Sequence, residues 1–240
     1  MRILGDAVEA VQRNLYALAL YLAVTVGFSI AGQVANYLVG GPPESPYASG
    51  FWTAYLLGLD AAFLIAIGLA QAVVFSRLGK DIDRPLWKIG GDGEAAKRYF
   101  VLWLALNAGA TALDRVALWS QTVLGNDALT ATLVLFQSVV IVVHIPIGAA
   151  IMFLGRFEWR KLPECLRPLW RQFPQTLVVV LFNGVWFALF IFLLAQTESQ
   201  RWLRPGLQVV FAYVDCVVFA ATWFICMLDR QEPEEIDLGF

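Results

Sequence analysis

The chain has 240 residues, of which 59% are hydrophobic and 15% are charged, and its formal net charge is −2. Soluble domains carry about 25% charged residues, so a water-soluble fold could not cover this much apolar surface. Long uncharged runs alternate with short stretches that hold most of the Lys and Arg, as spans and loops do in helical membrane proteins. The composition therefore excludes a soluble globular domain.

The segment before the first long apolar run is amphipathic, with apolar residues at helical spacing on one side and charged residues on the other. The apolar set is Ile3, Leu4, Ala7, Val8 and Val11, and the charged set is Asp6, Glu9 and Arg13. We predict a helix that lies flat at the membrane interface. The apolar run that follows is longer than the roughly 7–15 residues of a signal-peptide core, so we expect a retained span.

Six windows are apolar over the roughly 20 residues that a helix needs to cross a bilayer. They are residues 15–38, 51–76, 99–123, 128–154, 174–196 and 206–228. Helices are expected, because an open strand would leave its backbone groups unpaired in lipid. We therefore predict an all-α membrane protein, a six-transmembrane-helix bundle that forms a single membrane domain over 1–230, followed by an acidic cytoplasmic tail over 231–240.

Basic residues favour one orientation of these spans. If Met1 is cytoplasmic, fourteen Lys and Arg lie in cytoplasmic segments, only Arg201 and Arg204 lie outside, and Arg115 falls within a span. Cytoplasmic loops carry the excess of Lys and Arg, so we predict that both termini are cytoplasmic. We expect the basic loops to meet anionic lipid headgroups at that face rather than nucleic acid.

The cytoplasmic segments contain a short internal repeat. Arg84-Pro85-Leu86-Trp87 recurs as Arg167-Pro168-Leu169-Trp170, each time followed by a basic residue and each time ahead of an odd-numbered span. Together with the amphipathic segment at the N-terminus, this predicts three units, each made of an interfacial helix and a two-span hairpin. The units would cover residues 1–77, 78–157 and 158–230.

In this layout the chain resembles a group of bacterial six-span membrane families that includes the membrane domain fused to some glycerophosphodiester phosphodiesterases. The resemblance rests on the interfacial segments and the two Arg-Pro-Leu-Trp copies, and it implies a multi-pass protein of the bacterial inner membrane. It carries over no catalytic residue, because the phosphodiesterase chemistry of those fusions belongs to a separate soluble domain.

Four charged residues fall inside the predicted spans: Asp60, Asp114, Arg115 and Asp215. Each lies about nine residues from the outer end of its window, so we expect all four in one layer about 13 Å deep. Either Arg115 bridges aspartates and pins the spans together, or the group forms a proton or cation site. A third alternative is that these side chains snorkel to the surface, or that the span ends are misassigned. Because neighbours on a helix diverge by about 100°, Arg115 should pair with an aspartate of another span.

Other polar residues of the spans either line a channel through the bundle or form hydrogen bonds between helices. The candidates are Asn107, Gln137, His144 and Asn183. His144 stands two residues before Pro146, which should kink the span near Val142 and free a carbonyl for another donor. For His144 we expect a hydrogen-bonded core imidazole, with a proton relay as the alternative.

The three cysteines, Cys165, Cys216 and Cys226, form no Cys-x-x-Cys pair. Cys216 and Cys226 would be about 15 Å apart on one helix, which is beyond the reach of a disulfide. With a single histidine in the chain, we expect no metal and no cofactor.

These patterns predict a non-enzymatic integral inner-membrane protein, a helical module that serves transport or envelope assembly through contacts with other components, including protein partners in the membrane. The alternative is a small proton- or cation-coupled permease that uses the four intramembrane charges. A membrane enzyme acting on lipid is a third hypothesis, which is disfavoured because no catalytic constellation lies in reach of lipid headgroups.

Overall fold

The computed structural model describes residues 2–38, 50–83, 91–155, 161–196 and 203–231, and all regular structure in these ranges is helical. Six of the helices are long and apolar enough to cross a membrane. The expected all-α architecture with six candidate spans is therefore confirmed. The first Arg-Pro-Leu-Trp copy at 84–87 and the acidic tail from 232 onward lie outside the described residues.

The helices follow the predicted windows closely. Their bounds are α1 Arg2–Arg13, α2 Leu15–Leu38, α3 Gly50–Ile82, α4 Asp92–Trp119, the π-helical turn η2 Ser120–Leu124, α5 Asp127–Leu154, α6 Leu162–Arg171, α7 Phe173–Gln196 and α8 Leu203–Gln231. The amphipathic segment at the N-terminus forms α1, and the second Arg-Pro-Leu-Trp copy lies in α6. The three-unit organisation stays a prediction, since the first copy of the motif is outside the described residues.

Two helices extend at least six residues past one end of their predicted windows. α3 continues past residue 76 to Ile82, and α4 begins at Asp92 instead of near residue 99. Hydropathy locates only the apolar part of a span, whereas the backbone hydrogen bonds of a helix continue into its polar ends. Here Arg77 Nε donates to Asp92 Oδ1 at 2.8 Å and ties the two extensions together.

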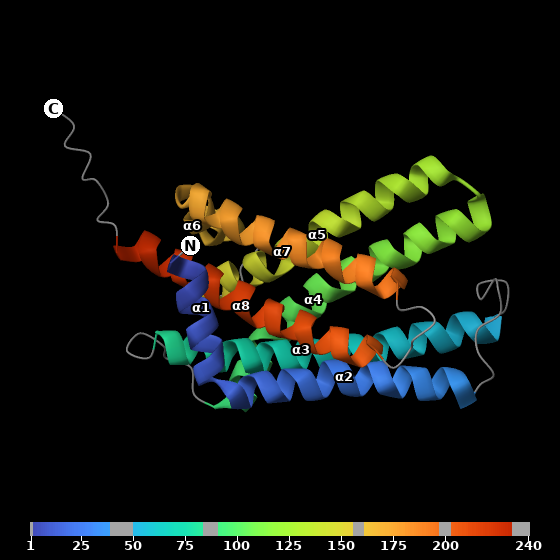
Figure 1. The fold of residues 1–240 in the computed structure, drawn as a ribbon, viewed down its shortest axis with the longest axis horizontal. Helices are drawn as coiled ribbons and strands as arrows, with labels where there is room; N and C mark the ends of the chain where they lie inside the picture. The colour runs from blue at the N-terminus through green and yellow to red at the C-terminus, as the bar shows by residue number, and fades with distance from the viewer. Residues whose placement is uncertain (1, 39–49, 84–90, 156–160, 197–202, 232–240) are drawn as a thin grey trace.

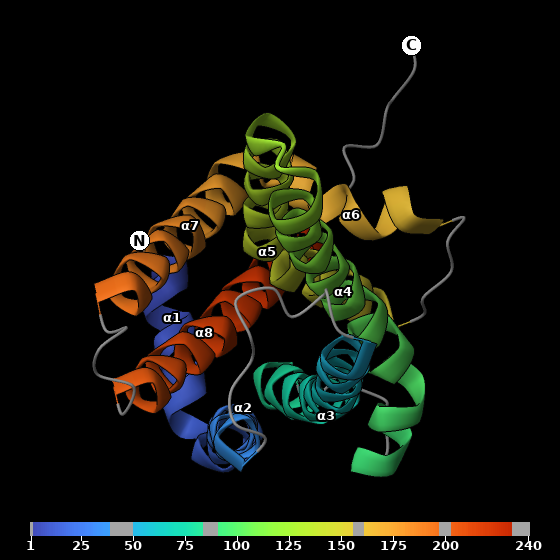
Figure 2. The same ribbon diagram turned by 90° about the vertical axis from the view of Figure 1, so that its right-hand side faces the viewer.

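The six long helices form three antiparallel hairpins on three sides of the molecule (Figures 1 and 2). α2 packs on α3, α4 on α5, and α7 on α8. The short helices α1 and α6 lie at the end of the molecule where α8 ends (Figure 1). We call this end the α6 end and the opposite one the η2 end.

The turn at the η2 end is shaped by two residues. Gly125 has a φ of 60°, a left-handed conformation that glycine adopts without strain. Asn126 then caps α5, because its side-chain oxygen accepts a hydrogen bond from the backbone N–H of Leu129 at 3.0 Å. The chain thereby reverses direction between α4 and α5 within a few residues.

α8 is the central helix of the bundle. Nearly every side chain from Ala212 to Cys226 is buried, and the helix contacts α1, α2, α3, α5, α6 and α7. Aromatic rings fill the space around it: Phe219 stacks on Phe75 with ring centroids 4.4 Å apart, and Trp223 meets Phe153 edge-on at 5.1 Å. The core is therefore built where α8 crosses the other helices.

Two glycines allow indole rings to approach the helix backbone. A Cβ at Gly79 would lie 2.9 Å from the ring of Trp223, and a Cβ at Gly148 would overlap the ring of Trp103. Both tryptophans are fully buried. The dense part of the core thus depends on positions where no side chain is present.

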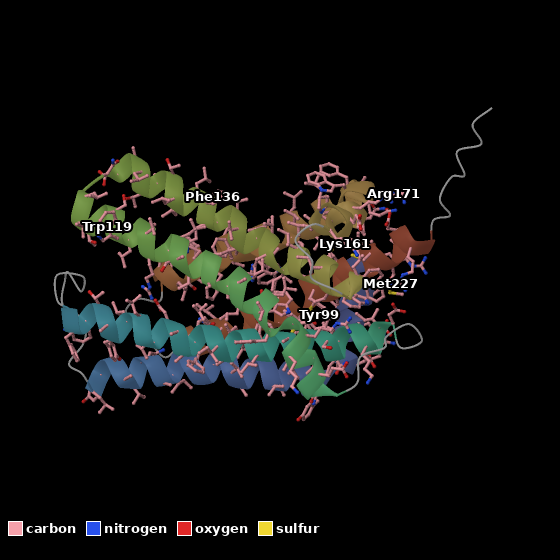
Figure 3. All side chains as sticks on the ribbon, turned by 180° about the vertical axis from the view of Figure 1, so that it is seen from behind. Tyr99, Trp119, Phe136, Lys161, Arg171 and Met227 are labelled. Carbon is pink, nitrogen blue, oxygen red and sulfur yellow. The ribbon has the colours of Figure 1, made fainter. Side chains whose placement is uncertain are left out.

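The hairpins separate toward the η2 end. Figure 3 shows the α4–η2–α5 hairpin, which carries Trp119 and Phe136, standing away from α2 and α3 there. Large apolar side chains are exposed toward this end, including Leu57 of α3 and Val134 of α5. The molecule is consequently tightly packed toward the α6 end and open toward the η2 end.

Candidate functional site

Arg115 and Asp60 form an ion pair between α4 and α3. The guanidinium binds the carboxylate with two hydrogen bonds, Nε to Oδ2 and Nη2 to Oδ1, each 2.6 Å long. Paired donors of this kind match a carboxylate better than a single contact does. The sequence-based expectation that Arg115 pairs with an aspartate of another span agrees with this geometry.

Asp114 and Gln137 extend the pair to a third helix. Asp114 Oδ2 lies 3.8 Å from Arg115 Nη1, and Gln137 Nε2 donates to Asp114 Oδ1 at 3.2 Å. We refer to Asp60, Asp114, Arg115 and Gln137 as the Arg115 cluster. It joins α3, α4 and α5, and its two carboxylates exceed its one guanidinium by one formal negative charge.

Asp215 belongs to a separate group. Its Oδ2 accepts a hydrogen bond of 2.9 Å from the hydroxyl of Tyr21, which in turn accepts one of 3.1 Å from Gln71 Nε2. Gln71 Oε1 then accepts from Asn107 Nδ2 at 2.5 Å. This hydrogen-bonded series, the Asp215 chain, runs through α8, α2, α3 and α4, and Asp215, Tyr21 and Gln71 are all buried.

The four intramembrane charges therefore do not lie in one layer, in contrast to the expectation from the sequence. Gln71, which shares the Asp215 chain, stands eleven residues from Asp60 along α3, a rise of about 16 Å. Counting from the ends of hydropathy windows assumes equal tilt and register for every helix, and α8 does not meet that assumption. Sequence reasoning also missed Tyr21, since nothing in its neighbourhood distinguishes it from other tyrosines of the spans.

Asn183 binds α5 at the carbonyl that Pro146 was expected to leave free. A proline cannot donate to the carbonyl four residues earlier, and in α5 that carbonyl belongs to Val142. Asn183 Nδ2 of α7 donates to this Val142 oxygen at 2.8 Å. The remaining polar candidate, His144, contacts its own helix, with Nδ1 2.6 Å from the oxygen of Ile141.

The polar candidates thus take part in separate contacts. Asn107 belongs to the Asp215 chain, Gln137 to the Arg115 cluster, Asn183 to the α5–α7 contact, and His144 to a local bond within α5. Cys165, Cys216 and Cys226 are buried, and no disulfide joins them in the part of the chain that the structure describes. Within the described ranges, no group of three or more His, Cys, Asp or Glu side chains is arranged to hold a metal.

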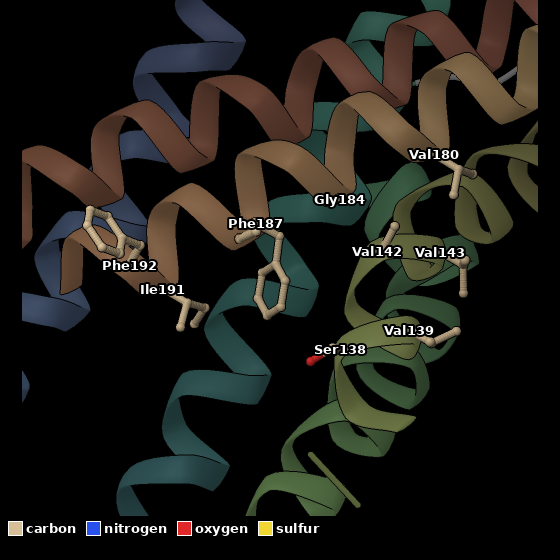
Figure 4. Close-up of a pocket in the computed structure, with 10 residues that line it drawn as sticks. Ser138, Val139, Val142, Val143, Val180, Gly184, Phe187, Ile191 and Phe192 are labelled. Carbon is tan, nitrogen blue, oxygen red and sulfur yellow. The ribbon is translucent and has the colours of Figure 1, made fainter. Parts of the chain in front are cut away.

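A cleft of about 590 Å³ lies between α5 and α7. The two helices meet near Val142 and Val180 and diverge from there toward the η2 end (Figure 4). Phe187 and Ile191 of α7 line one wall, and Val139 lines the other. The one hydroxyl in the lining, that of Ser138, is satisfied by the oxygen of Val134 at 2.8 Å. The cleft is therefore apolar throughout.

No family model, curated protein or solved structure matches this chain. The resemblance to six-span families of the bacterial inner membrane stays a prediction from layout.

Proposed function

We propose that this protein is a non-enzymatic integral membrane module that serves transport or envelope assembly through contacts with other membrane components. The observation that carries the proposal is the α5–α7 cleft. A concave apolar surface within the membrane is suited to a lipid chain or an apolar helix, and it is reached from the bilayer by lateral movement alone. A component of the membrane can thus engage the protein without leaving the hydrocarbon.

The polar contacts support this proposal, because they hold the walls of the cleft in place. Asn183 joins α7 to α5 at the point where the helices meet. The Arg115 cluster joins α5 to α4 and α3, and interhelical polar contacts in membranes commonly stabilise bundles in this way. In this proposal the intramembrane charges have a structural role, and the cleft is the surface that acts on other components.

Orientation is part of the proposal. We place the α6 end at the cytoplasmic face of a bacterial inner membrane, because the excess of basic residues lies in the segments at that end. Reporter fusions at Arg13, Gly91 and Leu162 should read cytoplasmic, and fusions at Glu44, Asn126 and Ser199 should read periplasmic. A periplasmic signal at Gly91 or Leu162 would overturn this orientation.

Photocrosslinking tests the cleft directly, using a photoreactive amino acid at Val139 or Ile191, which line it. Matched controls are available on α2: Val34 is exposed to the same 52% as Val139, and Ile30 is exposed by 48% against 50% for Ile191. We expect discrete adducts from intact membranes at the two cleft positions and only diffuse labelling at the two controls. Equal labelling at all four positions would contradict the proposal.

A small proton- or cation-coupled permease is the second candidate, and one observation favours it. The side chain of Asp114 is 51% exposed although it lies within a predicted span, so the Arg115 cluster contains one accessible carboxylate. Reconstituted protein should then pass protons or cations, and Asp114→Asn should abolish that flux while leaving the protein folded. An absence of flux in wild-type proteoliposomes would eliminate this candidate.

A further inference from the structure

We infer that an anionic phospholipid binds along α7, with its headgroup at α6 and its acyl chain reaching into the narrow end of the α5–α7 cleft. This inference rests on the proposed function, because it names the membrane component that the cleft engages. It follows from the continuity of two cavities, the length of the resulting groove and the charge at its α6 end.

The cleft continues into a second cavity at the α6 end. That cavity has a volume of about 270 Å³ and is lined by α5, α6 and α7. Val143 and Val180 line both cavities, so the two cavities are adjacent. Together they extend along α7 from Phe173 to Phe192, and we call this combined space the groove.

The length of the groove matches a lipid of one leaflet. Gly184 stands eleven residues after Phe173, a rise of about 16 Å along the helix, which is close to half of the roughly 30 Å hydrocarbon core. An acyl chain whose headgroup lies at α6 would therefore end near Gly184, at the middle of the membrane. Beyond Gly184 the groove widens into the open part of the cleft.

α6 supplies the third wall of the groove. Leu166, Leu169 and Trp170 of α6 line the second cavity, and their spacing of three and four residues places them on one face of that helix. A lipid in the groove would contact α5, α6 and α7 at once, whereas a lipid on an ordinary surface touches one convex helix face. Trp170 is largely exposed, as tryptophans at the level of headgroups commonly are.

The charge at this end suits an anionic headgroup. Arg167 is exposed, and it stands three residues before Trp170, which places it about 60° around the helix from that ring. Lys161 and Arg171 add positive charge at the two ends of α6, against one carboxylate, Glu164. Arg171 also lies 3.4 Å from Asp229, so Arg167 is the residue best placed for the lipid phosphate. Guanidinium groups bind phosphate oxygens through paired hydrogen bonds.

Lipid retention measured by native mass spectrometry tests the inference on the full chain in mild detergent. We expect wild-type protein to retain added phosphatidylglycerol in preference to phosphatidylcholine. Arg167→Gln should reduce that preference about fivefold, the effect of one basic residue at an anionic surface. Arg13→Gln is its matched control, since Arg13 is an exposed arginine on the other interfacial helix, α1, and it should leave the preference unchanged.

A second variant tests the groove itself. Val180→Trp fills the junction of the two cavities and should lower the retention of both lipids, whereas Val34→Trp on α2 should not. If Val180→Trp fails to fold, Arg167→Gln still tests the inference. The Arg167 side chain is exposed, so its replacement should not affect folding. Equal retention of the two lipids by wild-type protein, or an unchanged preference in Arg167→Gln, would overturn the inference.

Photocrosslinking from Val143, which lines both cavities, separates this inference from the proposed function. An adduct with the mass of phosphatidylglycerol supports both. An adduct with a protein refutes the lipid inference and leaves the proposed function intact. Labelling no stronger than at Val34 refutes both.

Discussion

Asn183 of α7 donates a hydrogen bond of 2.8 Å to the carbonyl oxygen of Val142, the acceptor that Pro146 leaves without a partner in its own helix. A break in one helix is thereby satisfied by a side chain of another. The contact lies where α5 and α7 meet, at the narrow end of the cleft.

The first prediction concerns the coupling between these residues. Asn183→Ala should lower the free energy of unfolding by about 1 kcal/mol, a typical net value for a hydrogen bond. In a Pro146→Ala background the same change should cost close to nothing, because the alanine N–H now bonds to the Val142 oxygen. A double-mutant cycle of unfolding in mixed micelles measures the difference. An equal cost in both backgrounds would show that the proline and the asparagine are independent.

The second prediction concerns the Arg115 cluster. Arg115→Ala leaves the half-buried carboxylate of Asp60 without its guanidinium partner, at a cost of up to about 3 kcal/mol, the lower end of the range for buried pairs. We expect a lower yield of folded protein and a lower melting temperature in detergent. Adding Asp60→Asn should recover much of the loss.

Asp215→Asn is the matched control for that rescue. Asp215 accepts its hydrogen bond from Tyr21 and lies outside the Arg115 cluster, so Asp215→Asn should not compensate for the loss of Arg115. Rescue by Asp215→Asn as strong as that by Asp60→Asn would mean that the two groups are coupled.

The third prediction concerns the Asp215 chain. Tyr21→Phe removes the hydroxyl that joins Asp215 to Gln71 and leaves two buried polar groups unpaired, so it should destabilise the protein by about 1–3 kcal/mol. Asp215→Asn keeps an acceptor oxygen for Tyr21 and should cost less than Asp215→Leu, which removes it. Thermal melting of the three variants in one detergent provides the comparison. The prediction fails if Asp215→Leu is as stable as Asp215→Asn.

The fourth prediction concerns the close approach of Trp103 to Gly148. In Gly148→Ala the added methyl group overlaps atoms of the Trp103 indole ring, and overpacking of this kind costs about 1–3 kcal/mol. Gly109→Ala is the control, since no atom lies within 4 Å of a Cβ at that position. Alanine is the better helix former by about 1 kcal/mol, so Gly109→Ala should be neutral or stabilising. Identical melting temperatures for the two variants would contradict the packing described here.

The spans were predictable because the cost of unpaired backbone groups in lipid leaves helices as the only solution for long apolar runs. α1 was predictable as well, since its apolar residues follow the helical period. A partner for Arg115 on another span followed from the divergence of neighbouring side chains, although the choice of Asp60 over Asp215 did not. That choice depends on the tilt of α8, which local patterns do not encode.

The cleft was not predictable from the sequence. Val139 and Ile191 are ordinary residues of apolar helices, and their types are the same whether they face lipid, another helix or a cavity. What distinguishes them is the angle between α5 and α7 (Figure 4). Pro146 and Asn183 indicate a polar contact between the two helices, but neither residue determines the angle between them.

The central position of α8 also has a consequence for the order of assembly. Domains of a growing chain form from the N-terminus onward, and α8 is the last of the six described spans to leave the ribosome. Tyr21 and Gln71 therefore enter the bilayer before Asp215 exists to complete their hydrogen bonds. Until then, the faces of α1, α2, α3, α5, α6 and α7 that pack on α8 have only lipid or the insertion machinery as neighbours. Among the described spans, the central one is thus inserted last, into a shell of helices that is already in the membrane.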